Sequence, residues 1–295
     1  MKKNILKPYH YFIAPAFIFI LFVSIYPLLY GFGISLTNLR YDRKTVNFIG
    51  LDNYLDFFSW EYFPQILGNS LIYLFFSLFI TLVFGTIFAL ALNQNYRGRV
   101  FARTVSVLPW VLPAVIVGVV FQLMFSSSKM GLLNSFLLVI GLESIRWLTE
   151  PAIAMIAVII TFSWRTMAFG TIVILAGLQT VPPELYEVSK IDGIGPVNSF
   201  RYITLPYLKA QILVVLVMVS AGALNQVDSI MSVTGGGPGR STEILALAIY
   251  REGFEFLKAG FAASISMFVL FINICITVFY FIVLGRKEGD FTHAQ

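Results

Sequence analysis

The sequence predicts an all-α protein that crosses a membrane six times. Of its 295 residues, 58% are hydrophobic and only 12% are charged, whereas a soluble domain carries about 25% charged residues. The apolar residues also gather in runs that are long enough to span a hydrocarbon core about 30 Å thick. These runs cover residues 12–36, 69–92, 105–125, 151–178, 210–230 and 260–284. We therefore expect one polytopic membrane domain over the whole chain, 1–295.

The first run is interpreted as a retained helix. It follows the basic residues Lys2, Lys3 and Lys7, as a signal peptide would, but it is too long and lacks a small-residue cleavage site. Pro15 and Pro27 are expected to bend this helix, because proline removes a backbone hydrogen bond. The first run therefore counts as a membrane span.

The remaining runs differ in polar content. The second, third and sixth contain no Asp, Glu, Lys or Arg, whereas the fourth includes Arg165 and the fifth includes Asp228. A further apolar stretch, 132–142, has only eleven residues and is too short to span a bilayer as a helix. We expect it to form a helix at the membrane interface. The polar segment 37–68 is expected to form a small external cap.

Basic residues predict that both termini lie in the cytoplasm. The short loop 93–104 contains Arg97, Arg99 and Arg103 and no acidic residue. Short loops rich in Lys and Arg stay on the cytoplasmic side of a membrane. With this orientation, eleven of the twenty basic residues are cytoplasmic and eight are external. The predicted topology is N-in and C-in.

Composition and motifs argue against several other classes of protein. Membrane orientation accounts for the net charge of +5, so we expect no nucleic-acid partner. The single cysteine, Cys275, cannot form an intramolecular disulfide, and His10 and His293 lie near opposite termini, so no metal site is expected. The glycine-rich segment 235–240 lacks the Walker A spacing and is expected to be a tight turn. Because no nucleophile and base are grouped, we expect neither an enzyme nor a bound cofactor.

The loop 179–209 has the pattern of a short helix followed by a turn. Pro183 can begin a helix, and Glu184 and Glu187 complement the positive end of its dipole. Gly193 can adopt the left-handed conformation that ends a helix. The sequence therefore predicts a short helix from about Pro183 to Asp192.

A second short helix is expected in the same loop. Pro196 can begin it, Pro206 limits it, and Phe200 and Ile203 are spaced to share one face. The loop is thus predicted to be a helix–turn–helix on the cytoplasmic surface. The alternative is an ordinary solvated connector, because most loops are surface segments.

The spacing within this loop resembles the cytoplasmic coupling signature of ATP-binding cassette (ABC) importer permeases. In that family, Glu-Ala-Ala is followed after three residues by Gly, and after nine more by Ile, one residue and Leu-Pro. The matching positions are Glu187, Gly193, Ile203, Leu205 and Pro206, with Val188 and Ser189 in place of the two alanines. The resemblance implies that an ATPase subunit is contacted by Glu184, Glu187, Ser189, Asp192, Gly193, Ile203, Leu205 and Pro206.

The segment 233–266 resembles the carbohydrate-uptake subgroup of these permeases, typified by the maltose, glycerol-3-phosphate and multiple-sugar permeases. The matching positions are Thr234, Gly236, Gly237, Pro238, Thr242, Tyr250, Phe254 and Gly260. The resemblance implies a type I ABC importer permease fold in the cell membrane of a bacterium or archaeon. The implied partners are a second related permease, two ATPase subunits that use ATP and Mg²⁺, an external substrate-binding protein, a carbohydrate and membrane lipid.

Polar residues within the fourth and fifth runs are the candidate substrate contacts. A charge at the centre of a span costs about 2.5 to 3.5 kcal/mol, so such groups usually face protein, water or one another. A ring or methyl surface beside amide and guanidinium donors suits a sugar, which has apolar C–H faces and many hydroxyls. The candidates are Arg165, Thr166, Phe169, Asn225, Gln226 and Asp228. An ion pair of Arg165 with Asp228 that braces the helices is the alternative.

Two other functions are compatible with a polytopic chain. A secondary transporter or channel would use Arg165 and Asp228 for gating or ion coupling and would work without ATPase subunits. A membrane scaffold or enzyme would have no pathway. Neither explains the spacing from Glu187 to Pro206. The expected function is therefore that of a permease forming half of the translocation pathway of an ATP-driven importer.

Overall fold

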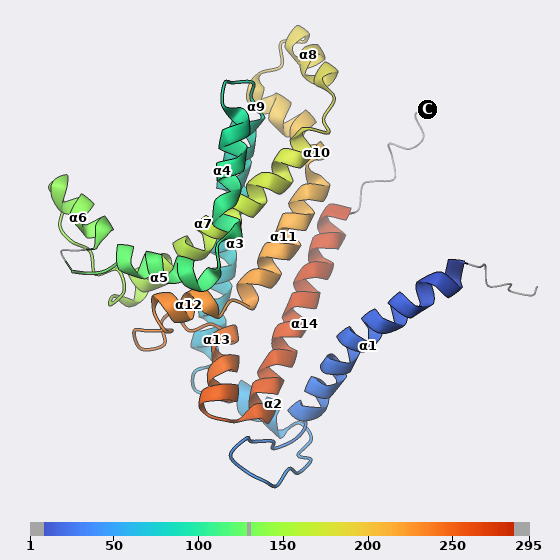
Figure 1. Cartoon of the computed structure of the whole chain (residues 1–295), viewed down its shortest axis with the longest axis vertical. Helices are drawn as coiled ribbons and strands as arrows, with labels where there is room; N and C mark the ends of the chain where they lie inside the picture. The colour runs from blue at the N-terminus through green and yellow to red at the C-terminus, as the bar shows by residue number, and fades with distance from the viewer. Residues whose placement is uncertain (1–8, 129–130, 286–295) are drawn as a thin grey trace, which may run out of the picture. The chain divides into compact units, whose positions relative to one another are not determined.

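The computed structural model describes residues 9–128 and 131–285, which form helices and their connections (Figure 1). In chain order, the helices are α1 (Tyr9–Ser35), α2 (Asp52–Phe58), α3 (Phe63–Asn93), α4 (Arg99–Val111), α5 (Ala114–Met124), α6 (Leu132–Val139), α7 (Pro151–Leu178), α8 (Pro183–Ile191), α9 (Pro196–Ser199), the π-helical turn η1 (Phe200–Thr204), α10 (Leu205–Tyr207), α11 (Lys209–Leu224), α12 (Asp228–Val233), α13 (Leu245–Tyr250), the π-helical turn η2 (Arg251–Glu255) and α14 (Ala259–Leu284).

The all-α prediction is confirmed. Within the described ranges, the extended pairing is a single isolated bridge between Thr37 and Phe48, and no strand forms. Helices are the natural outcome for a lipid-exposed chain, because each backbone N–H and C=O must be paired where water is absent. Some residues named above lie outside the described ranges: Lys2, Lys3, Lys7 and His293.

Four helices are long and apolar enough to cross a membrane by themselves: α1, α3, α7 and α14. Two further segments meet the same criterion only as bent pairs, α4 with α5 and the stretch 196–207 with α11. The helix axes turn by 94° in the first pair and by 70° in the second. The described residues therefore supply four to six membrane spans, and the chain is a multi-pass membrane protein.

The third predicted run, 105–125, is divided between two helices that meet at a sharp bend, α4 and α5 (Figure 1). Pro113 explains the break. It has no N–H to continue the helix, and it holds Leu112 in the extended conformation at φ −66° and ψ 137°. The third run is therefore not one straight helix.

The fifth predicted run, 210–230, also does not continue as one helix, because α11 ends early. The side-chain amide of Asn225 donates to the carbonyl of Ala221 at 2.8 Å, and the backbone N–H of Asn225 turns to the carbonyl of Gly222 at 3.3 Å. The side chain thus takes the acceptor that a continuing helix would use. The chain becomes helical again at α12, so Asp228 begins a separate short helix and is exposed.

The described residues form two compact units, one within residues 1–63 and 248–268 and the other within residues 64–247 and 269–295. In the first unit, the side-chain amide of Asn53 on α2 donates to the carbonyls of Ser35 at 2.7 Å and Thr37 at 2.8 Å. These bonds satisfy carbonyl groups that the end of α1 leaves unpaired. Beside them, the buried ring of Phe57 lies 5.3 Å from the ring of Phe268. The cap segment is therefore fastened to α1 and α14.

In the second unit, α3 and α7 cross closely at two small residues. A Cβ atom on Gly85 would lie 3.3 Å from the carbonyl carbon of Gly170. Next to this contact, the Oγ1 atoms of Thr81 and Thr166 lie 2.8 Å apart, and both residues are buried. Small residues and hydroxyl hydrogen bonds are common means of helix association in lipid. This crossing holds the middle of α7 in a defined position.

Candidate functional site

The loop 179–209 folds as two short helical arms. The prediction that the second arm ends before Pro206 is wrong: the arm continues through Pro206 to Tyr207, because Pro206 lies in the first turn of α10, where proline is tolerated. The first arm is α8, which starts with a proline and carries Glu184 in its first turn and Lys190 in its last. These charges complement the helix dipole. The second arm consists of α9, η1 and α10. We refer to residues 183–207 as the 183–207 hairpin.

Gly193 sets the angle at which the chain leaves α8. Its φ is +71°, its N–H donates to the carbonyl of Lys190 at 3.1 Å, and the N–H of Ile194 donates to the carbonyl of Ser189 at 2.8 Å. This pair of bonds is a Schellman motif, in which glycine supplies the left-handed residue. A Cβ atom at Gly193 would have nothing within 4 Å. Conformation, and not lack of space, is therefore what favours glycine here.

Hydrogen bonds between the two arms make the hairpin a compact body. The hydroxyl of Tyr186 on α8 lies 2.9 Å from Thr204 Oγ1 on η1, and Ser189 Oγ lies 3.4 Å from Ser199 Oγ. Ser189, Ser199 and Thr204 are all buried. Ser189, one of the predicted coupling residues, thus lies inside the hairpin and contacts its second arm.

The outside of the hairpin exposes large apolar side chains. Ile191 is 84% exposed and Val197 is 77% exposed, and Val188 and Tyr202 are also exposed. Large apolar side chains that stay exposed and gather on one surface are typical of a protein-contact site. Among the other predicted coupling residues, Ile203 is half-buried, and the exposed ones are Glu184, Glu187, Asp192, Gly193, Leu205 and Pro206.

Two of the predicted substrate residues, Arg165 and Phe169, lie against α4. The guanidinium carbon of Arg165 is 5.1 Å from the ring centroid of Trp110, within the range of a cation–π contact. The same ring stacks on Phe169, with centroids 4.7 Å apart and planes at 29°. All three side chains are partly exposed. We refer to Trp110, Arg165 and Phe169 as the Trp110 cluster.

Trp110 was missed as a site residue from the sequence. The sequence feature that could have indicated Trp110 is its position inside an apolar run. Tryptophan in membrane proteins is enriched at the two membrane interfaces and not between them. The sequence does not show that it meets α7, since Trp110 and Arg165 are 55 positions apart. The cluster adds an aromatic surface beside the guanidinium.

The alternative in which Arg165 braces the helices through Asp228 is not realised. None of the ion pairs within residues 9–128 and 131–285 includes Arg165, and its Nε atom is buried without a hydrogen-bond partner. Asp228 is exposed at the start of α12. The end of α11 explains the difference, because it removes Asp228 from a continuous fifth helix.

The other predicted substrate residues lie in two settings. Thr166 is buried, and its hydroxyl bonds the side chain of Thr81 and the carbonyl of Phe162, so here it joins α3 to α7. Asn225 and Gln226 lie in the break between α11 and α12, where Asn225 is exposed and Gln226 is buried. Their contact with substrate stays a prediction.

The glycine-rich segment after α12 forms a tight turn. Across its base, the Oγ1 atoms of Thr234 and Thr242 lie 2.7 Å apart. The side-chain amide of Asn69 on α3 donates to the carbonyls of Arg240 and Glu243, each at 3.0 Å. The turn is therefore fastened to α3.

Metal-ligating side chains do not gather in the part of the chain that the structure describes. There, no group of three or more His, Cys, Asp and Glu residues could hold a metal ion. The cysteine, Cys275 on α14, is exposed. The described residues present two candidate contact surfaces: the exposed apolar side chains of the 183–207 hairpin, and the rings and guanidinium of the Trp110 cluster.

Similar protein sequences cover nearly the whole chain. It is 31% identical to a probable ABC transporter permease of Bacillus subtilis, with 98% of this chain and 100% of that one covered. It is 33% identical to the permease of a sulfoquinovosyl glycerol transport system of Agrobacterium fabrum, with 94% and 90% covered. Identity is also 33% to a trehalose/maltose transport system permease of Thermococcus litoralis, with 94% and 93% covered.

Solved structures have the same fold. A bacterial ABC transporter involved in the import of alginate has a chain that is 24% identical, with a TM-score of 0.79 and with 94% of this chain and 95% of that one covered. A bacterial alginate transporter in complex with an alginate pentasaccharide-bound periplasmic protein gives 25% identity and a TM-score of 0.78, with 92% and 91% covered.

The family match covers the candidate coupling site. Residues 81–288, which include the 183–207 hairpin and the turn after α12, match one family over more than half of the chain. An importer permease accounts for the spacing from Glu187 to Pro206, which a channel or secondary transporter leaves unexplained. The chain belongs to the family described as the inner membrane component of binding-protein-dependent transport systems, the permease subunits of ABC importers.

Proposed function

We propose that this permease carries a carbohydrate or sugar derivative across the cell membrane of a bacterium or archaeon. The observation that supports this proposal most strongly is the 33% identity, over 94% of the chain, to permeases named for trehalose/maltose and for sulfoquinovosyl glycerol transport. The chemistry of the Trp110 cluster supports this class, because an aromatic ring can cover the C–H face of a sugar while a guanidinium donates to its hydroxyls. The amides of Asn225 and Gln226 add further hydrogen-bonding groups.

The chain acts as one half of a translocation pathway and works with other polypeptides. A second related permease forms the other half, and an external binding protein delivers the substrate. Two ATPase subunits bind ATP and Mg²⁺ and hydrolyse the nucleotide, while this chain binds no cofactor and catalyses no reaction. The family description and the periplasmic protein in the alginate transporter complex support this set of partners.

The 183–207 hairpin couples the pathway to ATP hydrolysis. Its exposed apolar residues, Val188 and Ile191 on α8 and Val197 on α9, offer a surface that an ATPase subunit covers. Its internal hydrogen bonds let the hairpin act as a rigid lever. Closure of the ATPase pair moves this lever, reorganises the spans and opens the pathway to the docked binding protein, after which the pathway returns to the inward-facing state.

The orientation N-in and C-in places this hairpin in the cytoplasm, where ATP is found. The basic loop 93–104 supports this orientation. It also places the external segment and the turn after α12 on the external face, where a binding protein docks. The external segment is predicted as 37–68, and it ends at residue 62 because α3 begins at Phe63.

Reconstitution tests the proposal. A thermal-shift screen of the cognate binding protein against mono- and oligosaccharides identifies the sugar, and uptake of that sugar is then measured in proteoliposomes containing both permeases and the ATPase subunits. Uptake should require ATP, the ATPase subunits and the binding protein, each omitted in turn as a control. Uptake that persists without the ATPase subunits would contradict the proposal and identify a secondary transporter.

A further inference from the structure

The side-chain amide of Gln226 is enclosed by protein but is not used to hold the fold together. Gln226 is only 9% exposed. Its backbone N–H donates to the carbonyl of Ala223 at 3.4 Å, and the hydrogen bonds found among residues 9–128 and 131–285 do not include its side chain. A buried amide is normally paired, so an unpaired one supports the prediction that Gln226 contacts the substrate.

The direction of Gln226 depends on the position of α12. The residue before it, Asn225, is bonded to the end of α11 through its side chain. The first backbone bond of α12 runs from the N–H of Met231 to the carbonyl of Val227 at 2.9 Å, so this helical turn begins directly after Gln226. Gln226 therefore lies between a fixed helix end and α12, and a shift of α12 turns its amide.

One side of α12 is positioned by α5, against which it mainly packs. The two helices meet at Gly118 in the middle of α5. A Cβ atom on Gly118 would lie 2.6 Å from the Cβ atom of Ser232 and 3.4 Å from the Cα atom of Ser229. Non-bonded carbon atoms pack at about 3.5–4.0 Å, and rotation of the Ser232 side chain does not move its Cβ atom. Only glycine at position 118 therefore lets α12 lie this close to α5.

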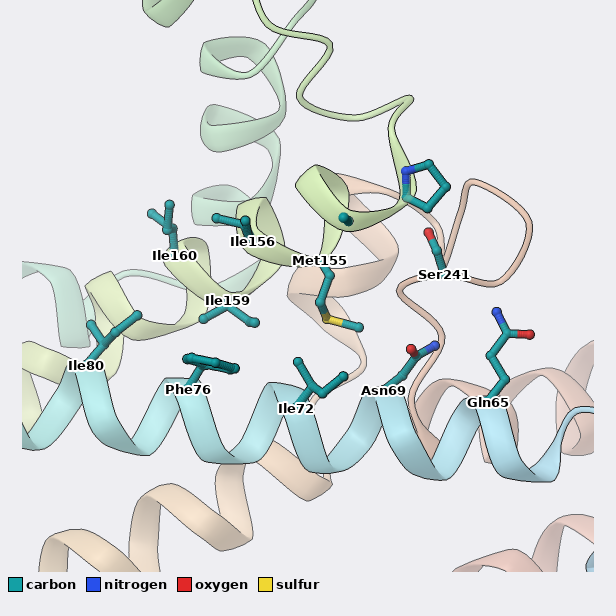
Figure 2. A pocket seen from close by; sticks show the side chains of 12 residues that line it. Gln65, Asn69, Ile72, Phe76, Ile80, Met155, Ile156, Ile159, Ile160 and Ser241 are labelled. Carbon is teal, nitrogen blue, oxygen red and sulfur yellow. The ribbon is translucent and has the colours of Figure 1, made fainter.

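The end of α12 is held by α3 through the turn that follows. The two threonine hydroxyls at the base of this turn lie 2.7 Å apart. The side-chain amide of Asn69 donates to the carbonyls of Arg240 and Glu243, each at 3.0 Å. Figure 2 shows Asn69 on the side of α3 that faces Ser241 in the turn. The position of α12 is therefore set by α5 at its side and by α3 at its end.

We propose that Gly118 and Asn69 are positioning residues for the substrate, because they hold α12 where the amide of Gln226 meets the sugar. Neither residue has to contact the sugar itself. An amide group both donates and accepts hydrogen bonds, as a sugar hydroxyl does. The inference rests on the proposed carbohydrate substrate and adds two residues that determine how tightly the permease binds it.

Equilibrium binding tests the role of Gly118. The complex of both permeases and the ATPase subunits is placed in nanodiscs without the binding protein, and the Kd is measured for a tritiated form of the sugar identified by the thermal-shift screen. Gly118→Ala should raise the Kd about two- to tenfold, the effect of losing one hydrogen bond. Gly68→Ala is the matched control, because a Cβ atom there has nothing within 4 Å, and it should leave the Kd unchanged.

A compensating substitution separates this effect from a general defect. Ser232→Gly removes the Cβ atom that the new methyl group would meet, so Gly118→Ala combined with Ser232→Gly should restore the Kd of the Ser232→Gly variant. The Kd does not depend on how much of the complex is folded, whereas the number of binding sites does. A merely structural role would therefore lower the number of sites and leave the Kd unchanged.

A double-mutant cycle tests whether Gly118 acts through Gln226. Gln226→Leu should raise the Kd about as much as Gly118→Ala does. Adding Gly118→Ala to Gln226→Leu should change the Kd by less than about twofold, because the amide that Gly118 positions is already absent. Asn69→Leu keeps the size of the side chain and removes both donated bonds, so it should also raise the Kd. It tests the proposal if Gly118→Ala fails to assemble.

Three results would overturn the positioning role. One is an unchanged Kd in the assembled Gly118→Ala and Asn69→Leu complexes, whatever the number of sites. Another is an equal effect of Gly118→Ala with and without the Gln226 amide. The third is a parent complex that does not bind the sugar. ATP-dependent sugar uptake by the parent complex with its binding protein keeps the proposed function separate, since any of these results beside normal uptake rejects only the positioning role.

Discussion

At the scale of single residues, Gly193 has the most specific conformational role. A β-branched residue at φ +71° is strained, and the left-handed region costs an ordinary L-residue about 1–2 kcal/mol. Gly193→Val should therefore lower binding-protein-stimulated ATP hydrolysis and sugar uptake about tenfold in proteoliposomes. Gly193→Asn should stay within about twofold of the parent, because asparagine tolerates this conformation. Equal activities of the two variants would show that the turn does not aim the hairpin.

A second prediction at this scale concerns the Trp110 cluster. Trp110→Leu removes the ring that contacts both Arg165 and Phe169, so it should raise the sugar concentration needed for half-maximal uptake about threefold or more. Trp110→Phe, which keeps an aromatic ring, is the matched control and should have a smaller effect. Unchanged concentration dependence in Trp110→Leu would remove this residue from the pathway.

The unpaired state of Arg165 gives a third prediction. Asp228→Asn should shift the free energy of unfolding by no more than about 0.5 kcal/mol, because Asp228 is exposed and none of the described ion pairs joins it to Arg165. If the two residues formed a buried pair, removing one charge would cost about 3 to 5 kcal/mol. Thermal unfolding of the purified complex in detergent distinguishes these values. A loss of several kcal/mol would restore the ion-pair interpretation.

At the scale of elements, the crossing of α3 and α7 depends on two glycines that meet. Gly85→Leu forces a side chain toward the backbone of Gly170, and overpacking of this kind costs about 1–3 kcal/mol. Gly68→Leu is a matched control on the same helix, because a Cβ atom there would have nothing within 4 Å. We expect thermal stability in detergent to fall for Gly85→Leu and to be kept for Gly68→Leu. An equal fall would mean that the close approach is not limiting.

The same scale includes the docking of the hairpin. Ile191 is 84% exposed on α8, so Ile191→Asp should not disturb the fold of this chain. If an ATPase subunit covers Ile191, the buried carboxylate weakens docking by about 2 kcal/mol or more. Retention of the ATPase subunits during purification should then fall at least tenfold, while Ile191→Met should retain them. Glu187→Lys should also lose substrate-stimulated ATP hydrolysis, whereas a simple connector would tolerate all three changes.

At the scale of the whole molecule, the prediction is the orientation in the membrane. In a Cys275→Ala background, Asp52→Cys should react in intact cells with a membrane-impermeant thiol reagent, and Arg99→Cys should react only after the cells are opened. Both positions are exposed, so access to the reagent depends on the side of the membrane. The reverse pattern would invert the topology and remove the hairpin from the cytoplasmic ATPase subunits.

Much of this protein follows from short stretches of its sequence. Hydropathy depends on the composition of one helix, so the runs around α3, α7 and α14 are visible without any tertiary information. The 183–207 hairpin is equally local, because proline, charge and Gly193 act within one or two turns. The spacing from Glu187 to Pro206 carries the family resemblance for the same reason.

Other properties depend on contacts between distant parts of the chain. Pro113 marks a break between α4 and α5, but the sequence does not show what the two helices pack against on either side of the 94° turn: α4 packs mainly against α7, and α5 mainly against α12. The sequence predicts that the hydroxyl of Thr166 contacts a sugar, but in the structure this hydroxyl lies 2.8 Å from the hydroxyl of Thr81. The contact of Trp110 with Arg165 and Phe169 also depends on tertiary packing. The same is true of the missing ion pair between Arg165 and Asp228. Hydropathy and helix capping depend on residues that are close together in the sequence. The contact between two helix faces depends on side chains that are far apart in the sequence.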